Sequence, residues 1–237
     1  METTTAAEWK EEGVTYAVMA SDAFNSGTIG VAIAREPSLL YHLLKRLLDI
    51  VLATVGIVVL IPLFFVIAVR IKLEDQGTLF YCREMIGLRG KRFTLLKFRT
   101  MIPDADTYLD RHPELKLAYE KNMKLQDDPR ITRAGGLLRR TYLDELPQLF
   151  NVLAGQMSLV GPRAIHQREQ ALYGEYAEKR HSVKPGMTGL WQISPDRYRC
   201  YEDRILLDMR YIDTCSLFLD LVILVKTIKV LIAQTGV

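Results

Sequence analysis

The sequence predicts an α-rich α/β domain that is cytoplasmic and is anchored to a membrane by a kinked re-entrant helix and by amphipathic interfacial helices. Three observations support this fold class: an uncharged run at 50–69, the alternating segment FTLLKF, and leucines that recur at helical spacing between 143 and 153. A period of 2 is typical of strands, and a period near 3.6 is typical of helices. The 237 residues, of which 49% are hydrophobic, suffice for one core and one membrane element.

The overall composition excludes several classes of protein. A net charge of +3 is too mild to indicate nucleic-acid binding, so no nucleic acid is expected as a partner. The three cysteines form no CxxC pair, and the sequence therefore indicates neither a disulfide framework nor a zinc site. A reducing cytosol is the expected compartment.

We divide the chain into an N-terminal extension at 1–40, a membrane helix at 41–73 and a cytoplasmic domain at 74–237. The extension has acidic residues early and no basic segment that leads into an apolar run, so it does not resemble a secretory signal. We assign it no role.

The uncharged run is long enough to span a bilayer, which requires about 20 apolar residues. Lys45 and Arg46 precede the run, and Arg70 and Lys72 follow it, so both flanks carry the positive charge that is typical of cytoplasmic segments. Pro62 lies inside the run and predicts a kink there, because proline removes a backbone donor and clashes with the preceding turn. A re-entrant helix fits these observations, and an ordinary single-pass anchor is the alternative.

The segment after the membrane helix is basic. Six cations lie close together around a predicted short strand: Arg83, Arg89, Lys91, Arg92, Lys97 and Arg99. They predict either a site for an anion or a surface that faces anionic lipid headgroups. Further along, a charged helix with a break at Pro113 is predicted at 104–124, and its exposed charges indicate a solvated face.

Two adjacent carboxylates, Asp144 and Glu145, occur in the segment TYLDELPQL. The surrounding leucines predict that one face of this segment is core, so the ionised carboxylates need a metal ion or nearby guanidinium groups. Arg139, Arg140 and Arg163 are the candidates. Arg163 follows a Gly-Pro turn and predicts either a bidentate phosphate contact or a structural salt bridge.

Several segments occur in the order found in one known family. KFRTM, DPRIT, LDELPQLFNVLAGQMSLVGPR and KPGMTGLWQ resemble the bacterial sugar transferases, which are monotopic polyprenyl-phosphate phosphoglycosyl transferases, and the resemblance covers 42–237. YGEY, YEDRILLDMRYID and SLFLDLVILVKTIKVLI resemble the hexose-1-phosphate branch, which starts O-antigen, capsule or exopolysaccharide units. Known members transfer galactose phosphate or glucose phosphate. The resemblance implies that 74–237 is a phosphoglycosyl transferase domain.

The resemblance also implies roles for the carboxylate pair. Asp144 would attack the β-phosphate of a UDP-sugar and displace UMP, forming a covalent phosphosugar intermediate. Undecaprenyl phosphate would then take the phosphosugar. Glu145 would ligate Mg²⁺, which suits a hard oxygen ligand.

The same resemblance identifies the side chains that would contact the substrate phosphates. Lys97, Arg139 and Arg163 match such positions, and Arg99 is a further candidate that could instead support the fold. The expected partners are a UDP-sugar, undecaprenyl phosphate and membrane lipid, and a homodimer is compatible with the sequence. The expected location is the cytoplasmic face of the bacterial inner membrane.

Three departures from the family pattern occur. Ala164 replaces a second proline after GPR, SPDR replaces an SGR-type sequence after WQ, and Ile61 precedes Pro62 where some relatives have serine. The SPDR change leaves the identity of the sugar open.

Two further features have alternative interpretations. Trp191 is expected to pack in the core, although it could stack on uracil. The apolar segment at 217–233 contains Asp220, Lys226 and Lys229, which favours an interfacial or core-packed helix over a membrane span.

Two other classes of function compete with an enzyme. A membrane-anchored scaffold for polysaccharide assembly would account for a degenerate SPDR loop, but it would not require the Asp-Glu pair. A basic binder of nucleic acid or lipid headgroups would be repelled by that pair unless a metal ion intervened.

Overall fold

The structure is a computed structural model that describes residues 38–122, 125, 127–195 and 200–232. Every described residue belongs to a single compact unit. The predicted extension at 1–40 therefore lies outside the described residues, except for its last three positions.

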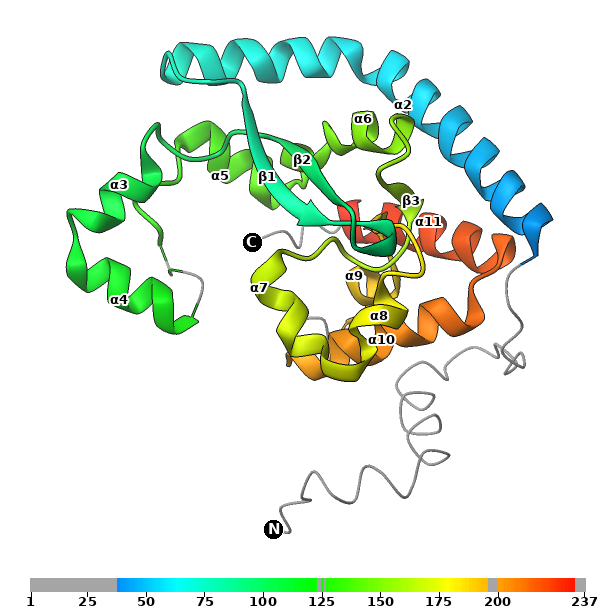
Figure 1. The fold of residues 1–237 in the computed structure, drawn as a ribbon. Helices are drawn as coiled ribbons and strands as arrows, with labels where there is room; N and C mark the ends of the chain where they lie inside the picture. The colour runs from blue at the N-terminus through cyan, green and yellow to red at the C-terminus, as the bar shows by residue number, and fades with distance from the viewer. Residues whose placement is uncertain (1–37, 123–124, 126, 196–199, 233–237) are drawn as a thin grey trace. The chain divides into compact units, whose positions relative to one another are not determined.

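The first described element is the long helix α2, Leu39–Glu74. It begins at Ser38, whose hydroxyl accepts a hydrogen bond from the N–H of Tyr41, a typical helix start. Pro62 lies inside the helix, and the helix axis changes direction along its length (Figure 1). Within the described part of the chain, α2 is the one helix that is long and apolar enough to cross a membrane.

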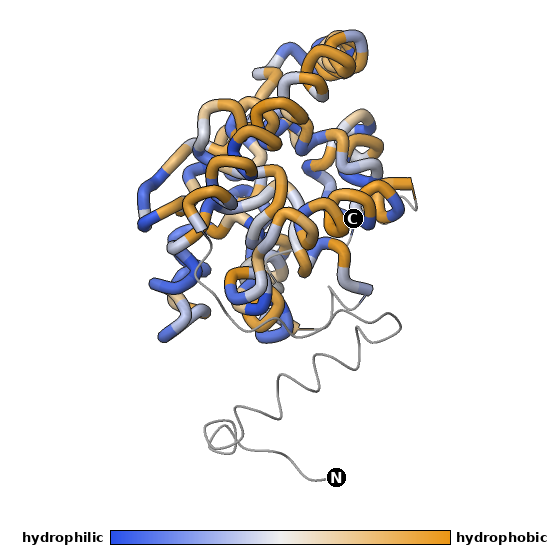
Figure 2. Tube along the Cα trace, turned by 90° about the vertical axis from the view of Figure 1, so that its right-hand side faces the viewer, coloured by the Kyte–Doolittle hydropathy of each residue, from blue (hydrophilic) through white to orange (hydrophobic). Residues whose placement is uncertain are grey.

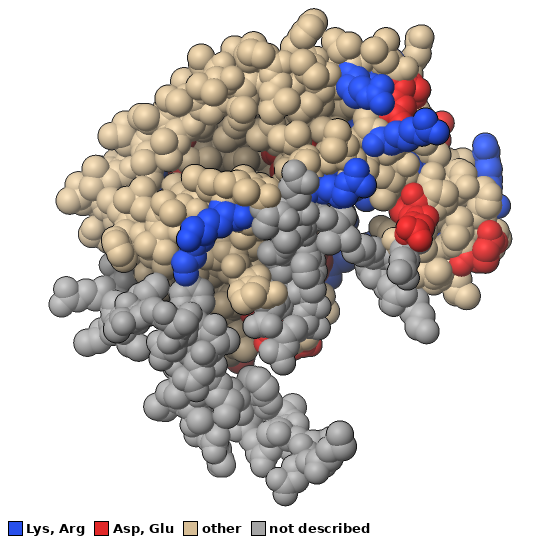
Figure 3. Space-filling model, turned by 180° about the vertical axis from the view of Figure 1, so that it is seen from behind, with Lys and Arg blue, Asp and Glu red and all other residues tan. Residues whose placement is uncertain are grey.

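Large apolar side chains are exposed along α2. Leu39 and Leu73, near its two ends, are 75% and 76% exposed, and Phe65 is 70% exposed. The helix is hydrophobic over most of its length (Figure 2), and uncharged residues form most of the surface over it in the space-filling view (Figure 3). An apolar surface of this extent is typical of a membrane contact.

The predicted FTLLKF strand is confirmed as β2, Arg92–Phe98, which pairs with β1, Phe80–Ile86, in an antiparallel hairpin. A short helix, η2 at Leu88–Gly90, joins the strands, and Arg89 and Gly90 adopt positive φ there. The register places Tyr81 opposite Lys97, so the two side chains lie on the same face of the hairpin.

The charged helix predicted at 104–124 occurs as two helices, α3 at Ala105–Asp110 and α4 at Pro113–Asn122, with the predicted break at Pro113. Proline is favoured at the first position of a helix because its missing N–H would have no partner there.

The leucine-rich run between 143 and 153 is less regular than its spacing predicts. It consists of a 3₁₀ turn, η3 at Leu143–Glu145, and a separate helix, α6 at Gln148–Leu153, which follow α5 at Arg133–Arg140. Pro147 separates the two elements, and Tyr142 precedes η3 with a φ of 57°. Leu149 is buried as expected, whereas Phe150, predicted to face the core, is 41% exposed on α6.

The remaining elements surround a second, two-stranded sheet in which β3, Ser158–Val160, runs parallel to β4, Gly186–Thr188. A β-carbon on Gly161 or Gly186 would lie within 2.6 Å of backbone atoms, so both positions require glycine for the close approach of the two segments. The helices of this region are α7 at Gln167–Gln170, η4 at Ala171–Tyr176, α8 at Ala177–Arg180, α9 at Leu190–Ile193, α10 at Tyr201–Thr214 and α11 at Leu217–Ile232.

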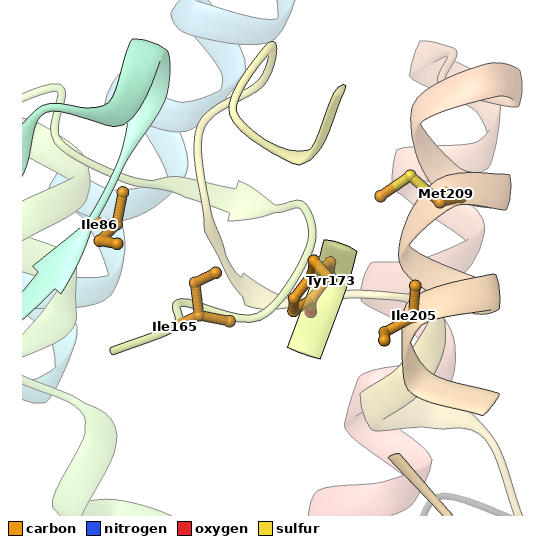
Figure 4. Packing of buried hydrophobic residues seen from close by; sticks show 5 residues of the cluster. All are labelled: Ile86, Ile165, Tyr173, Ile205 and Met209. Carbon is orange, nitrogen blue, oxygen red and sulfur yellow. The ribbon is translucent and has the colours of Figure 1, made fainter. Parts of the chain in front are cut away.

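One hydrophobic cluster joins the hairpin to this region. It consists of Ile86, Ile165, Tyr173, Ile205 and Met209, which come from β1, the loop after β3, η4 and α10 (Figure 4). The cluster fixes the position of the loop that follows β3.

A second hydrophobic cluster attaches α2 to the rest of the domain. Ile67 and Ile71 of α2 pack with Phe98 of β2, and Leu143 and Leu146 pack against this group. The turn that carries the two adjacent carboxylates is therefore held directly against the apolar helix.

Polar contacts fix the N-terminal part of α2. Lys45 Nζ donates to a carboxylate oxygen of the buried Asp220 of α11 at 2.8 Å. The backbone N–H of Leu159 donates to Asp49 at 2.9 Å, which joins α2 to β3.

Polar contacts also fix the C-terminal end of α2. Glu74 accepts hydrogen bonds from the N–H groups of Arg133 and Ala134, at 2.6 and 2.8 Å, and so caps the start of α5. Asp75, the next residue, forms an ion pair with Arg99. Both ends of α2 therefore contact the same folded unit.

The C-terminal helix α11 has two faces. Leu219, Asp220 and Ile223 are buried, while Phe218 and Ile228 are 71% and 57% exposed. This division agrees with the prediction that the segment packs on the domain and leaves an apolar face outward.

Candidate active site

The two adjacent carboxylates lie on η3, between two leucines that pack toward α2. Leu143 and Leu146 hold the turn against the apolar cluster, and Asp144 is only 8% exposed. Because burial disfavours a charged carboxylate, it raises the pKa of Asp144 above its ordinary value, although the nearby Lys97 acts in the opposite direction.

Lys97 joins both carboxylates. Its ammonium lies 2.6 Å from Glu145 Oε1 and 3.5 Å from Asp144 Oδ2. The contact spans the end of β2 and η3, and it places one positive charge between two negative ones. The repulsion between the neighbouring acids is therefore offset by Lys97, which the sequence had indicated as a contact for the substrate phosphates; the compensating cations expected there were Arg139, Arg140 and Arg163.

Glu145 is held in its ionised form. Burial raises the pKa of this carboxyl, but Lys97 and Arg163 outweigh burial and lower it to about 2. A hydrogen bond from the buried Gln148 acts in the same direction. At neutral pH Glu145 is negatively charged, as a metal ligand requires.

Arg163 approaches the pair from the loop after β3. One guanidinium nitrogen lies 3.8 Å from Glu145 Oε1, and the side chain is 38% exposed. Its backbone is fixed, because Arg180, which is fully buried, donates to the carbonyl of Arg163 at 2.6 Å. Ala164, which replaces a proline of the family pattern, is buried beside it.

Arg139 lies near Asp144. Its Nε donates to the hydroxyl of Thr100 at 2.9 Å. Burial lowers the pKa of its guanidinium, and the nearby Asp144 raises it. The helix α5 that carries Arg139 approaches Thr100 closely, since a β-carbon on Gly135 would lie 2.0 Å from the carbonyl oxygen of Thr100. Arg140, the neighbouring candidate, is exposed.

Arg99 has a different environment. It is 8% exposed, forms an ion pair with Asp75, and donates to the carbonyls of Thr78 and Met101 at 2.5 and 2.9 Å. These contacts use its guanidinium to join the end of α2 to β2. These contacts fit the second role that the sequence allowed for Arg99, which was to support the fold. They leave Arg99 outside the group around Asp144.

The structure thus brings together Asp144, Glu145, Lys97, Arg139 and Arg163 from η3, β2, α5 and the loop after β3. Sequence analysis missed two contributors to this group. Gln148 lies in the same motif, three residues after Glu145, a spacing that places side chains on one face of a helix. Arg180 has no local signal, because nothing in its surrounding sequence indicates burial.

The carboxylates fit a hard divalent cation. No group of three or more His, Cys, Asp or Glu side chains suited to a metal occurs among the residues that the structure describes. Asp144 and Glu145 offer two carboxylate ligands, which suits Mg²⁺, because that ion binds one or two carboxylates and completes its shell with substrate phosphates and water.

The arrangement suits a phosphate substrate. Three cations surround two carboxylates of different character: Asp144 is buried and its pKa is raised by that burial, whereas Glu145 is partly exposed and firmly ionised. Cations at such a site can bind phosphate oxygens, and a carboxylate that is not permanently paired can attack phosphorus.

Comparison with known proteins agrees with this chemistry. The sequence model of the family described as "Bacterial sugar transferase" matches residues 40–234. The chain is 41% identical over 196 residues to the exopolysaccharide production protein ExoY of Sinorhizobium fredii, which covers 81% of this chain and 87% of that protein.

Two further relatives have names that state a substrate. The chain is 40% identical over 197 residues to the undecaprenyl-phosphate galactose phosphotransferase of Salmonella typhimurium, covering 81% of this chain and 41% of that protein. It is 38% identical over 196 residues to the undecaprenyl-phosphate glucose phosphotransferase of Komagataeibacter xylinus, covering 78% and 35%. The chain thus spans less than half the length of these two relatives.

Proposed function

Because this chain belongs to the bacterial sugar transferase family, we propose that it transfers a hexose-1-phosphate from a UDP-sugar to undecaprenyl phosphate and releases UMP. The observation that carries the proposal is the pair of the buried Asp144 and its neighbour Glu145, with Lys97 between them. The names of the relatives support galactose or glucose as the sugar, and exopolysaccharide, capsule or O-antigen as the product.

In the first step, an oxygen of Asp144 attacks the β-phosphorus of the UDP-sugar. The bond from that phosphorus to the bridging oxygen breaks, and UMP leaves with the electron pair. The product is a phosphosugar joined to Asp144 through an acyl phosphate. Lys97, Arg139 and Arg163 stabilise the charge on the phosphate oxygens, which lowers the barrier.

In the second step, a phosphate oxygen of undecaprenyl phosphate attacks the same phosphorus. The bond to Asp144 breaks, and the carboxylate is restored. Two displacements at one carboxylate allow a soluble donor and a lipid acceptor to use the same site in turn. The attachment of η3 to α2 supports delivery of the acceptor from the membrane.

Mg²⁺ would be held by Glu145, with Asp144 adjacent, and would supply charge neutralisation at the diphosphate when bound. The low pKa of Glu145 supports this role, because the ligand must be ionised. Lys97 contacts the same carboxylate and would share it with the ion.

The contacts of α2 support a re-entrant, monotopic arrangement on the cytoplasmic face. A straight helix would extend roughly 38 Å between Asp49 and Glu74, at about 1.5 Å per residue. Yet Asp49 and Glu74 both accept hydrogen bonds from the same folded unit, Asp49 from β3 and Glu74 from the start of α5. A single pass across a core about 30 Å thick would break one of these sets of contacts, whereas a helix that bends at Pro62 preserves both.

A non-catalytic scaffold is the main alternative, and it does not explain why two carboxylates and three cations converge in one buried place. The direct test is to incubate the detergent-purified protein with a panel of UDP-sugars, undecaprenyl phosphate and Mg²⁺ while measuring UMP. We expect UMP to be released with UDP-galactose or UDP-glucose. Repeated turnover should require undecaprenyl phosphate. Lipid-bound protein that releases no UMP with any UDP-sugar would support the scaffold.

Topology is tested separately. Single cysteines replacing Ser38 and Gln76, in a background without Cys82, Cys200 and Cys215, should both resist an impermeant thiol reagent in intact cells. Labelling of Ser38→Cys alone would establish a single pass.

A further inference from the structure

Arg163 has a fixed backbone and a loosely held side chain. Its carbonyl is bonded to Arg180, and its main chain pairs with Gly186. By contrast, its guanidinium lies 3.8 Å from Glu145, too far for a hydrogen bond, and is partly exposed. Glu145 alone therefore does not fix the position of the guanidinium.

The ring of Trp191 supplies the second contact. The Arg163 Cζ atom lies 5.7 Å from the centroid of the Trp191 ring, within the range of a cation–π interaction. The indole Nε1 is buried and has no hydrogen-bond partner among the residues that the structure describes. The indole is therefore placed by contacts of its ring and not by its one polar atom.

A second arginine fixes the tryptophan. The Arg204 Cζ atom lies 5.2 Å from the Trp191 ring centroid and 4.9 Å from that of Tyr201. The Arg204 side chain is 7% exposed and donates to Glu169 at 3.2 Å. Arg204 is thus rigid where Arg163 is loose, and Trp191 lies in contact with both.

We propose that Trp191 is a positioning residue for Arg163, whose guanidinium it holds beside Glu145, where a substrate phosphate can bind. The inference rests on the proposed function for the identity of the phosphate ligand. The guanidinium can donate hydrogen bonds to phosphate oxygens from its edge while one of its faces stays against the indole, so the ring lowers the cost of placing it. Trp191 then affects the binding of the donor and has little effect on the step at Asp144.

Trp191 also provides a spectroscopic reporter of phosphate binding by Arg163. The chain has two tryptophans, so Trp9→Phe leaves Trp191 as the sole source of indole fluorescence. In a Trp9→Phe, Asp144→Asn background, which prevents turnover, titration with UDP-galactose or UDP-glucose should change the emission in a saturable way. Adding Arg163→Gln should abolish the change.

Kinetics provide an independent readout. Trp191→Leu removes the aromatic face, and we expect the KM for the UDP-sugar to rise about two- to fivefold, the value of an exposed cation–π contact, with kcat nearly unchanged. Trp191→Phe keeps an aromatic face and should restore most of the affinity. Tyr108→Leu, which removes an aromatic ring stacked on His112 at 4.2 Å, is the matched control and should leave the KM unchanged.

The binding of the UDP-sugar is measured by equilibrium dialysis. The proposal is overturned if the sugar binds and the Trp191 emission changes equally with and without the Arg163→Gln substitution. It is also overturned if Trp191→Leu and Trp191→Phe have equal KM values. Inorganic pyrophosphate separates this result from a failure of the proposed function. If no UDP-sugar binds, the function is wrong, and an emission change with pyrophosphate that requires Arg163 would still support the role of Trp191.

Discussion

Lys97 and Arg99 belong to one short motif, KFRT, yet they enter two different acid–base clusters. Lys97 contacts the adjacent carboxylates of Asp144 and Glu145, whereas Arg99 pairs with Asp75 at the end of α2. The acids differ in the sign of their pKa shifts. Hydrogen bonds from Arg99 lower the pKa of Asp75, and burial raises the pKa of Asp144.

This difference distinguishes a charge that stabilises the fold from a charge that the fold makes available for chemistry. A carboxyl whose pKa is lowered on folding stabilises the folded state when ionised. A carboxyl whose pKa is raised does the reverse, so Asp144 carries its charge at a cost to stability. We therefore expect substitutions at the two acids to have opposite consequences for stability and activity.

The largest effect is expected for Asp144→Asn. Loss of the nucleophile should reduce UMP release by on the order of 10⁴-fold or more. The folded protein should be as stable as the wild type or slightly more stable, because a disfavoured charge is removed. Parallel UMP assays and thermal melts test both parts, and a large fall in Tm with retained activity would reverse the assignment.

Glu145→Gln should have the next largest effect. Losing one anionic ligand should slow UMP release about 10²-fold, equivalent to about 2.7 kcal/mol in the barrier. Since the carboxylate is the proposed ligand of Mg²⁺, a high Mg²⁺ concentration should partly restore the rate. Rates measured across a Mg²⁺ titration check this, and a variant with wild-type Mg²⁺ dependence would remove Glu145 from that role.

Asp75→Asn sharpens the comparison from the structural side. Removing an ionised acceptor from Arg99 should lower the free energy of unfolding by about 1–3 kcal/mol, with the activity of the folded protein retained. The wild type should lose this contribution as the pH falls below about 4, since the lowered pKa gives stability only while Asp75 is ionised. The variant should lack that dependence.

The matched control is Glu84→Gln, which removes an ion pair with Arg92 between side chains that are 58% and 57% exposed. We expect a change of about 0–1 kcal/mol, because solvent screens exposed pairs. Equal losses for Asp75→Asn and Glu84→Gln in melts at neutral pH would contradict a structural role for the Asp75 pair.

The smallest expected effect is a shift in pH dependence for Lys97→Met. Lys97 favours the ionised form of Asp144, so removing it should raise the pKa of that carboxyl further. The acid limb of adduct formation should therefore move to higher pH. A limb at the same or lower pH would show that Lys97 does not act on Asp144.

The sequence predicted which side chains of the candidate site lie together better than it predicted their other contacts. Asp144, Glu145, Lys97, Arg139 and Arg163 converge as the motifs indicated. The contacts of Arg99 were not predictable, because β2 ends at Phe98 and the alternation that orients side chains in a strand does not extend to the next residue.

Two other features were also beyond the sequence. The apolar spacing between 143 and 153 predicted one helical face, but Pro147 and the positive φ of Tyr142 divide the segment and leave Phe150 exposed. Contacts between distant segments, such as Lys45 with Asp220, have no local signal because each residue alone reads as a solvated charge.

The most direct test of the central claim is intact-protein mass spectrometry after exposure to UDP-galactose or UDP-glucose with Mg²⁺ and without a lipid acceptor. We expect the wild-type protein to gain the mass of one phosphohexose and to lose it when undecaprenyl phosphate is added. Asp144→Asn should gain no such mass, whereas Trp191→Phe should gain it. A phosphohexose adduct that persists in Asp144→Asn would contradict the assignment of Asp144 as the nucleophile.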